Sequence, residues 1–243
     1  VKYGEADAFV SAGNTGATMV TSLFRLGRLK GINRPALTVV LPTATGSCVL
    51  LDVGANPDCK PRNLLEFAIM GSVYAEKVRG VPNPKVGIIS NGEEAGKGTD
   101  LVRETYTLLD KSRLNFYGNV EGKGVINGEV DVAIADGFTG NVMLKTSEAV
   151  AKLLITKIKE AIMNGGILAK LGGLLLKPAL GAVKAMLDPN AVGGIPLLGL
   201  EGLVIVAHGS SNADAIKNAI RAAKEAVEVD MLSSIREALK KNN

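Results

Sequence analysis

The sequence lacks several features that define whole classes of protein. Among its 243 residues are only two cysteines, Cys48 and Cys59, which are too few for a disulfide framework and have no zinc-binding spacing. It has no tryptophan and only 4% aromatic residues, which leaves few rings for stacking on nucleic acid. Neither G-x-G-x-x-G nor G-x-x-x-x-G-K-[ST] occurs, so the usual signals of a dinucleotide site and of a P-loop are missing.

Long apolar runs are also missing. No uninterrupted apolar run reaches the ~20 residues of a membrane-spanning helix, and the first residues do not resemble a signal peptide. We therefore expect a protein of the reducing cytosol. The chain begins at Val1 rather than at a methionine, and a strand-like stretch follows almost at once. We expect a fragment of a longer protein.

What the sequence does contain is a regular alternation of apolar strands and amphipathic helices. It is 47% hydrophobic and carries 29 glycines, a composition typical of globular α/β proteins. The pattern predicts an α/β fold of three α/β/α layers with a mostly parallel sheet. Strands are expected at 7–11, 36–42, 48–53, 85–90, 131–135 and 202–207, and helices at 15–27, 60–79, 98–111, 140–164 and 212–225.

Five of these strands are followed by glycine-rich polar segments, at 11–16, 54–57, 91–94, 136–141 and 208–212. Ligands of parallel sheets bind at the carboxyl ends of the strands, and the free amides of a following helix attract anions. We therefore expect all five segments at one edge of the sheet, around a phosphate-like ligand. The alternative is that the same Asn, Ser, Thr and Gly residues only cap helices and form turns.

The net charge of +4 lies in one part of the chain. Residues 147–187 contain six lysines and two glutamates, which accounts for all of it. In this segment Lys170, Lys177 and Lys184 recur every seven residues beside Leu171, Leu174 and Leu175. We predict an amphipathic hairpin, broken by Gly172-Gly173 and Pro178 into two short pieces, that contacts a membrane surface or an acyl chain. A buried dimer interface or a solvated helix face would give the same pattern.

Longer motifs add a resemblance to a known family. The sequence contains "SAGNTGA", "LLDVGAN", "NFYGNVEGKG", "VAIADGFTGNVMLKTSEAVA" and "LLGLEGLVIVAHGSS". In this order and spacing, these motifs resemble the bacterial phosphate acyltransferase family of fatty acid and phospholipid synthesis, from residue 4 to about residue 225. The family's opening Asp-Ala-Met-Gly-Gly-Asp motif, in roughly the first quarter of its chains, is absent here. The resemblance implies an incomplete site in this fragment.

The resemblance also implies an activity, a fold and partners. The activity is transfer of a long acyl group from acyl carrier protein to inorganic phosphate, which gives acyl phosphate. The implied fold is similar to phosphotransacetylases and to isocitrate and isopropylmalate dehydrogenases. The implied assembly is a homodimer at the inner face of the cytoplasmic membrane, close to a downstream glycerol-phosphate acyltransferase. No cofactor, metal or nucleic acid is expected.

This chemistry needs positioning more than a strong base. Phosphate is largely a dianion at neutral pH, since its second pKa lies near ~6 to 7, and a thiolate with a pKa of about 8.5 leaves readily. We predict four catalytic residues, Lys97, Asp136, Lys145 and His208. Asp136 would orient Lys145, move a proton or bind a metal, and His208 would protonate the leaving thiolate. Both lysines could instead be surface residues, and His208 could be structural.

The phosphate and substrate contacts are predicted at the strand ends. The residues are Ser11, Gly13, Asn14, Thr15, Gly16, Asn56, Asn91, Gly92, Gly137, Thr139, Gly140 and Asn141. Cys59 has only Lys60 beside it to activate the thiol, so a cysteine nucleophile is disfavoured.

We predict one α/β unit over 1–243, with a core of 1–160 and 190–243 and the hairpin at 161–189. Two other functions stay open at this point. A dehydrogenase of related fold would need a cluster of metal-binding aspartates and a cofactor loop. A lipid-surface scaffold without catalysis would need only the hairpin.

Overall fold

The computed structural model describes residues 1–186 and 193–242. The strands are β1 (Ala8–Ser11), β2 (Ala36–Thr43), β3 (Gly46–Leu51), β4 (Val86–Ile89), β5 (Phe116–Val120), β6 (Val132–Ile134), β7 (Ile195–Leu198) and β8 (Leu203–Val206). The helices are α1 (Thr15–Leu26), α2 (Pro61–Lys77), α3 (Asp100–Asp110), α4 (Gly122–Asn127), α5 (Gly137–Asn164), α6 (Gly166–Met186), α8 (Ala213–Glu228) and α9 (Met231–Lys241).

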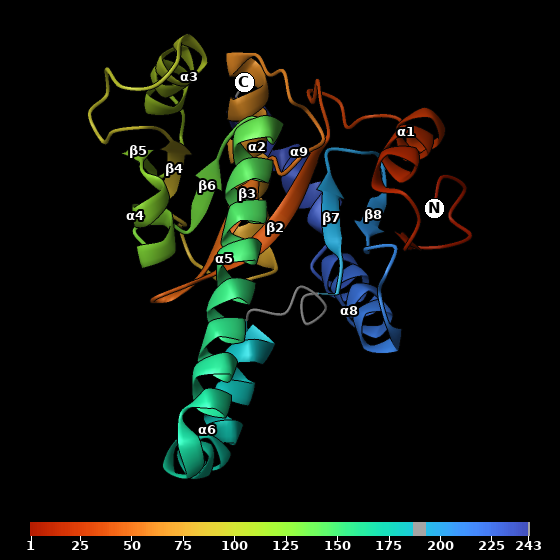
Figure 1. Cartoon of the computed structure of the whole chain (residues 1–243). Coiled ribbons are helices and arrows are strands. Elements are labelled where there is room, and N and C mark those ends of the chain that lie inside the picture. The colour runs from red at the N-terminus through yellow and green to blue at the C-terminus, as the bar shows by residue number, and fades with distance from the viewer. Residues whose placement is uncertain (187–192, 243) are drawn as a thin grey trace.

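The strands form one sheet in the order β1-β8-β7-β2-β3-β6-β4-β5. Four neighbouring pairs are parallel: β1–β8, β3–β6, β6–β4 and β4–β5. The three pairs in the centre of the sheet, β8–β7, β7–β2 and β2–β3, are antiparallel. Three successive reversals make β1 and β8 run opposite to β3, β4, β5 and β6. In Figure 1 the arrows of β6 and β8 accordingly point in opposite directions.

All six predicted strands and five predicted helices are present, with ends that differ by a few residues. β5 and β7 were not predicted. β5 contains Gly118 and Asn119, and β7 is only four residues long and contains Pro196. Neither strand has the continuous apolar run that a buried parallel strand shows.

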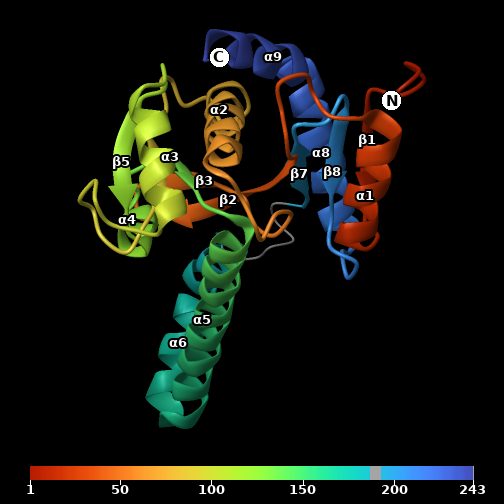
Figure 2. The same ribbon diagram turned by 90° about the horizontal axis from the view of Figure 1, so that it is seen from above.

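The sheet is covered on both faces, which confirms the three-layer prediction. Side chains of β3 alternate between two hydrophobic clusters: Val49 and Leu51 join α2 and α9, whereas Cys48 and Leu50 join α1 and the first turns of α5. This is the period of two that a pleated strand imposes. Seen from above, α2 and α9 lie on one side of the sheet and α5 on the other (Figure 2).

Helices α5 and α6 form a hairpin that projects away from the sheet in both views (Figures 1 and 2). The prediction of two short pieces is wrong, because α6 is one helix with Pro178 inside it. The glycines permit a close contact instead: a Cβ on Gly173 would lie 2.4 Å from Cγ2 of Ile162 in α5. α5 supplies the first arm from Gly137 onward, and residues 187–189 of the predicted hairpin fall outside the described residues.

Candidate functional site

The polar strand ends form two groups at opposite edges of the sheet, so the prediction that all five share one edge is wrong. The exits of β3, β4 and β6 meet at one edge, and those of β1 and β8 meet at the other. The cause is the set of three antiparallel pairs in the centre of the sheet. We call the first group, residues 52–57, 90–99 and 136–141, the α5 site, and the second, residues 11–16 and 207–212, the α1 site.

Asp52 organises the β3 end of the α5 site. Its carboxylate is fully buried. Oδ1 accepts hydrogen bonds from the amides of Leu37 (2.9 Å) and Ala55 (3.2 Å). Oδ2 accepts from the amide (2.7 Å) and the side-chain Nδ2 (3.0 Å) of Asn56. Burial raises the pKa of Asp52, while the four N–H donors oppose that rise. The carboxylate thus fixes the β3 exit loop against the start of β2.

The N-terminus of α5 packs directly on this loop. The amide of Gly137 donates to the carbonyl of Asn56 at 2.8 Å. A Cβ on Gly140 would lie 2.0 Å from the carbonyl oxygen of Asp52, and one on Gly137 would lie 2.8 Å from the carbonyl oxygen of Asn56. Only glycine allows backbone contacts this close, which explains both glycines of the "DGFTGN" motif.

Asp136 is the N-cap of α5. Its Oδ1 accepts from the amides of Phe138 (3.0 Å) and Thr139 (2.9 Å), and its Oδ2 accepts from the Thr139 hydroxyl (2.8 Å). The amide of Gly140 donates to the Asp136 carbonyl. Asp136 and Asn56 thus occupy the first amides of α5 in this structure, as the helix-cap alternative expects. Gly137, Thr139 and Gly140 shape the site.

The predicted lysines have different surroundings. Lys145 donates to Glu148 Oε2 at 2.8 Å and is exposed, so it does not pair with Asp136, and the surface-residue alternative describes it better. Lys97 is exposed in the loop after β4, and its aliphatic stem lies over Gly92. Glu93 pairs with Lys123 at 3.7 Å. Lys97 therefore stays a candidate for contact with substrate.

A cavity of about 530 Å³ lies between the exits of β4 and β6. Apolar side chains line part of its wall: Leu64, Ile88, Ile89, Val102 and Ala135. The polar lining comes from Ser90, Asn91, Thr99, Asp136 and Thr139. The Ser90 hydroxyl is buried and has no hydrogen-bond partner among the described residues. The cavity can take a ligand that has both a polar and an apolar part.

Asn56 and Asn141 were both predicted to bind substrate. Asn56 is buried, and its Nδ2 also donates to the Pro35 carbonyl at 2.7 Å, so it holds two segments together rather than facing a ligand. Asn141 is exposed beside Gly54, whose φ of +135° favours glycine. Of these two residues, only Asn141 is free to contact a substrate.

The α1 site is built mostly of caps. Ser11 Oγ accepts from the Gly13 amide at 3.1 Å, and Asn14 Oδ1 accepts from the Ala17 amide at 3.1 Å. Asn14 thus caps α1, and Ser11 stabilises the turn after β1, as the alternative of caps and turns expects. Thr15 and Gly16 are exposed in the first turn of α1. Thr15 and Gly16 could still contact an anion. The α1 site contains no buried carboxylate comparable to Asp52 of the α5 site among its described residues.

His208 belongs to the α1 site. It is exposed, and its Nδ1 lies 2.7 Å from Ser210 Oγ. The amide of Ala207 donates to the carbonyl of Ser11 at 2.8 Å, which joins the exits of β8 and β1. The four predicted catalytic residues are therefore not brought together in the described chain: Lys97 and Asp136 lie at one edge of the sheet and His208 at the other.

Cys59 lies next to the α5 site. Its thiol donates to the Asn56 carbonyl at 3.4 Å. Burial, together with the negative charges of Asp52 and Asp136, raises the pKa of Cys59 to about 12, while the Gly137 amide and Arg34 act to lower it. A thiol with this pKa is protonated at neutral pH, which agrees with the prediction that Cys59 is no nucleophile.

The α/β fold is similar to that of two solved phosphotransacetylases. EutD phosphotransacetylase from Staphylococcus aureus superposes with a TM-score of 0.54 at 16% identity, covering 99% of this chain and 64% of that one. A phosphotransacetylase from Streptococcus pyogenes gives 0.55 at 17% identity, covering 98% and 65%. At this identity the likeness establishes the fold alone.

The chain belongs to the fatty acid synthesis protein family, whose model matches residues 1–234. A phosphate acyltransferase from Elusimicrobium minutum is 52% identical over 237 residues, covering 98% of this chain and 69% of that protein. One from Desulfitobacterium hafniense is 54% identical over 240 residues, covering 98% and 72%. One from Aquifex aeolicus is 52% identical, covering 95% and 68%. The chain thus spans about 70% of the length of these relatives.

Sequence reasoning missed Asp52 as a member of the α5 site and Arg34 as a residue of the segment beside it. For Asp52 there was a signal, because a carboxylate directly after the buried run "CVLL" must be paired or hydrogen-bonded. Arg34 stands in the connection between α1 and β2, far in sequence from any predicted strand exit. Only the antiparallel pairing of β2 with β3 brings the start of β2 beside the end of β3.

Proposed function

We propose that this chain transfers a long-chain acyl group from acyl carrier protein to inorganic phosphate, giving acyl phosphate for phospholipid synthesis. The supporting observation is its membership of the fatty acid synthesis protein family, with phosphate acyltransferases about 50% identical over nearly its whole length. Acyl transfer to phosphate is the activity that these relatives' names state. Acyl carrier protein as the donor is our own proposal.

The α5 site supplies what this reaction requires. A phosphate oxygen attacks the thioester carbonyl, the C–O bond forms, and the thiolate leaves and takes a proton from solvent. Lys97 can stabilise the developing negative charge from the loop that borders the cavity. Asn91 and Thr99 offer hydrogen bonds at the cavity wall, and the apolar part of that wall suits the acyl chain. Asp136, committed to the α5 cap, keeps this geometry fixed.

The hairpin supports the proposed homodimer and the proposed contact with the inner face of the membrane. Its apolar side chains are exposed, with Leu168 at 84% and Leu175 at 83%. Others that are exposed are Leu153, Leu154, Ile158, Met163, Ile167, Leu171, Leu174, Leu176 and Met186. A patch of this extent marks an interaction surface.

The length and composition of α6 would also allow a membrane span. Its window Gly166–Val183 has a mean hydropathy of 1.4, and none of the window is buried. Lys170 and Lys177 fall inside this window, and Lys157 pairs with Glu160 on the neighbouring arm at 2.8 Å. These charges favour a helix that lies at a surface over one that crosses the bilayer. The side chain of Lys184 is outside the described part of the chain.

The lysines of the hairpin suit two proposed partners. Among the described residues, no ion pair is recorded for Lys152, Lys159, Lys170 or Lys177. Unpaired cations attract anionic lipids and acidic proteins such as acyl carrier protein, chiefly by steering their approach. A downstream glycerol-phosphate acyltransferase at the same membrane would then receive the acyl phosphate.

The test traps the product. The full-length chain is mixed with palmitoyl-acyl carrier protein, with and without phosphate, and acyl phosphate is captured as a hydroxamate. Hydroxamate that depends on both protein and phosphate is expected. If no hydroxamate forms while the protein still binds vesicles, the scaffold alternative replaces the enzyme. Reduction of a nicotinamide cofactor with a hydroxy acid would instead support the dehydrogenase.

A further inference from the structure

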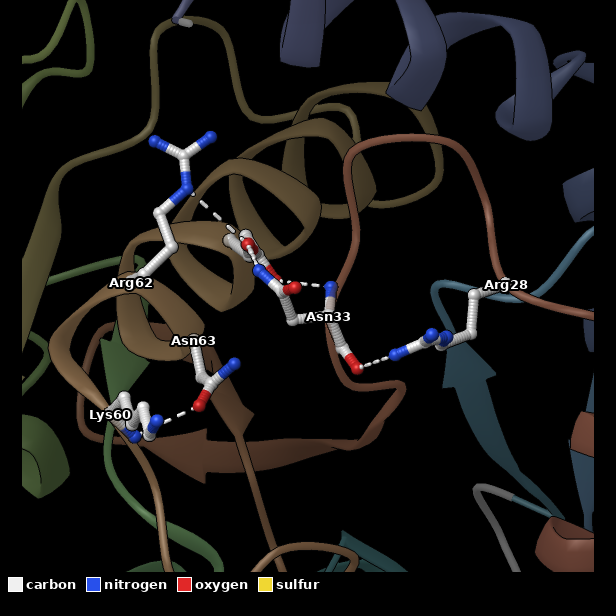
Figure 3. A network of polar contacts seen from close by, with 6 residues as sticks. Arg28, Asn33, Lys60, Arg62 and Asn63 are labelled. Atoms are coloured by element: carbon white, nitrogen blue, oxygen red, sulfur yellow. Dashed lines mark hydrogen bonds and ion pairs between the residues drawn. The ribbon is translucent and has the colours of Figure 1, made fainter.

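The connection between α1 and β2 contains Arg34, and hydrogen bonds hold this segment on both sides of that residue. We call residues 28–37 the strap. On one side, Arg28 Nη1 donates to the carbonyl of Asn33 at 2.5 Å. The amide and side chain of Asn33 donate to the two carboxylate oxygens of Glu66 at 2.7 and 2.5 Å. Figure 3 shows Asn33 between Arg28 and the α2 helix that carries Arg62 and Asn63.

On the other side, the strap is held by the α5 site. Asn56 Nδ2 donates to the Pro35 carbonyl at 2.7 Å, and the Leu37 amide donates to Asp52 at 2.9 Å. Asp52 and Glu66 are both fully buried. A buried carboxylate is costly unless N–H groups satisfy it. Glu66 therefore holds the strap at Asn33, directly before Arg34, and Asp52 holds it at Leu37, three residues after Arg34. Pro35 restricts the backbone further.

Arg34 itself is exposed, and neither an ion pair nor a hydrogen bond is recorded for its side chain within residues 1–186 and 193–242. Its charge acts on the thiol of Cys59, whose pKa it lowers. The Gly137 amide acts on the same thiol. Arg34 follows Asn33, which is bonded to Glu66, and precedes Pro35, whose carbonyl accepts from Asn56, so its backbone stands beside the β3 exit.

The α5 site needs a cation of this kind. Asp136 and Asn56 occupy the first amides of α5, and Lys145 is paired with Glu148. The negative charge of Asp136 would repel a phosphate dianion unless a fixed positive charge opposes it. A guanidinium is always charged, and its planar fork matches two oxygens of a phosphate.

We propose that Arg34 binds the inorganic phosphate substrate at the α5 site, and that the Asn33–Glu66 and Pro35–Asn56 contacts position it. The proposal rests on the proposed function, because phosphate is the substrate it names. It adds a specific phosphate ligand from a segment that no strand-exit motif includes.

The kinetic test uses three variants of the full-length protein. Arg34→Gln removes the charge, Arg34→Lys keeps the charge without the fork, and Lys30→Gln removes one exposed charge from the same strap as a control. The KM for phosphate is expected to rise at least about tenfold in Arg34→Gln, less in Arg34→Lys, and less than twofold in Lys30→Gln. The KM for the acyl donor is expected to stay constant.

An unchanged phosphate KM in Arg34→Gln, an equal rise in Lys30→Gln, or a rise in the donor KM alone would each overturn the proposal. A thermal melt of each variant establishes that it is folded.

A second readout does not depend on turnover. Phenylglyoxal modifies accessible arginines, and mass spectrometry of peptides reports each site. Inorganic phosphate is expected to slow modification of Arg34 at least threefold relative to Arg28, whereas sodium chloride of equal ionic strength does not. Equal protection of both arginines would refute the assignment. If protection is seen but no acyl phosphate forms, the proposed reaction fails and phosphate binding by Arg34 stands.

Discussion

Two regions of the molecule differ in where their apolar side chains lie. One is the sheet with its covering helices, and the other is the α5–α6 hairpin. In the sheet region, three clusters of apolar side chains are buried, and so are two carboxylates, Asp52 and Glu66, with their N–H donors. In the hairpin, leucines such as Leu168 and Leu175 face outward. The sheet region buries its apolar clusters within itself, whereas the hairpin leaves an apolar surface in solvent. Such a surface is typical of an interaction site.

The largest expected effect is on the free energy of unfolding when a glycine of the sheet region, rather than one of the hairpin, is replaced by alanine. Gly140→Ala places a Cβ about where the Asp52 carbonyl already lies, so we expect a loss of roughly 3 kcal/mol or more in the free energy of unfolding. Gly172→Ala in α6 meets open space and is expected to be neutral or to stabilise the helix by up to ~1 kcal/mol. Urea unfolding measures both. Equal effects in the two variants would contradict the contrast between the regions.

A charge introduced on the hairpin tests whether its exposed apolar surface is an interaction surface. Leu175→Glu is expected to leave the unfolding free energy within about 0.5 kcal/mol, because the side chain is already in water. Self-association in sedimentation and binding to anionic vesicles are each expected to weaken about tenfold or more, since a carboxylate now faces the partner surface.

Leu174→Ala serves as a milder control at an exposed neighbouring position. If Leu175→Glu destabilised the sheet region instead, the hairpin would be part of the core rather than an attachment surface.

The pH dependence of stability tests whether the two cysteines of the sheet region are buried. Burial raises the pKa of Cys48 and of Cys59 from 9.0 to about 12. Between pH 9 and 12 the unfolded thiols have lost protons that the folded ones keep, so stability is expected to fall as pH rises through this range. The double variant Cys48→Ala, Cys59→Ser should lose less stability between pH 9 and 11 when unfolded in urea. The same slope in both proteins would show that the thiols are not buried.

The smallest effect is expected at the junction of the two regions. Lys145→Ala removes an exposed pair with Glu148, which is worth at most about 0.5 kcal/mol. Acyl phosphate formation is expected to stay within about twofold. A drop of tenfold would restore Lys145 as a catalytic residue, and Lys157→Ala, which removes the corresponding pair with Glu160, is the matched control.

The sequence was sufficient to predict six of the described strands and five of the described helices, because apolar runs and helical periodicity are local features. It was not sufficient to predict which strand ends meet. Strand direction depends on pairings such as β2 with β7, between residues more than 150 positions apart. For the same reason Arg34 could not be placed beside Asn56.

The roles of the polar residues were equally ambiguous in the sequence. Asp136, Asn14 and Asn212 occupy positions at which one carboxylate or amide can either cap a helix or leave its amides to a ligand. The structure shows a cap in all three cases, because an accepting side chain at that position satisfies one or two free backbone donors of the first turn. The residue types alone do not distinguish the two roles.

The central claim is that acyl transfer to phosphate takes place at the α5 site. The most direct measurement is the rate of acyl phosphate formation from palmitoyl-acyl carrier protein in Lys97→Gln and in His208→Gln, one residue from each edge of the sheet. Our account predicts a fall of about tenfold or more in Lys97→Gln and a change of less than about threefold in His208→Gln. A large loss in His208→Gln with full activity in Lys97→Gln would contradict the account and move the chemistry to the α1 site.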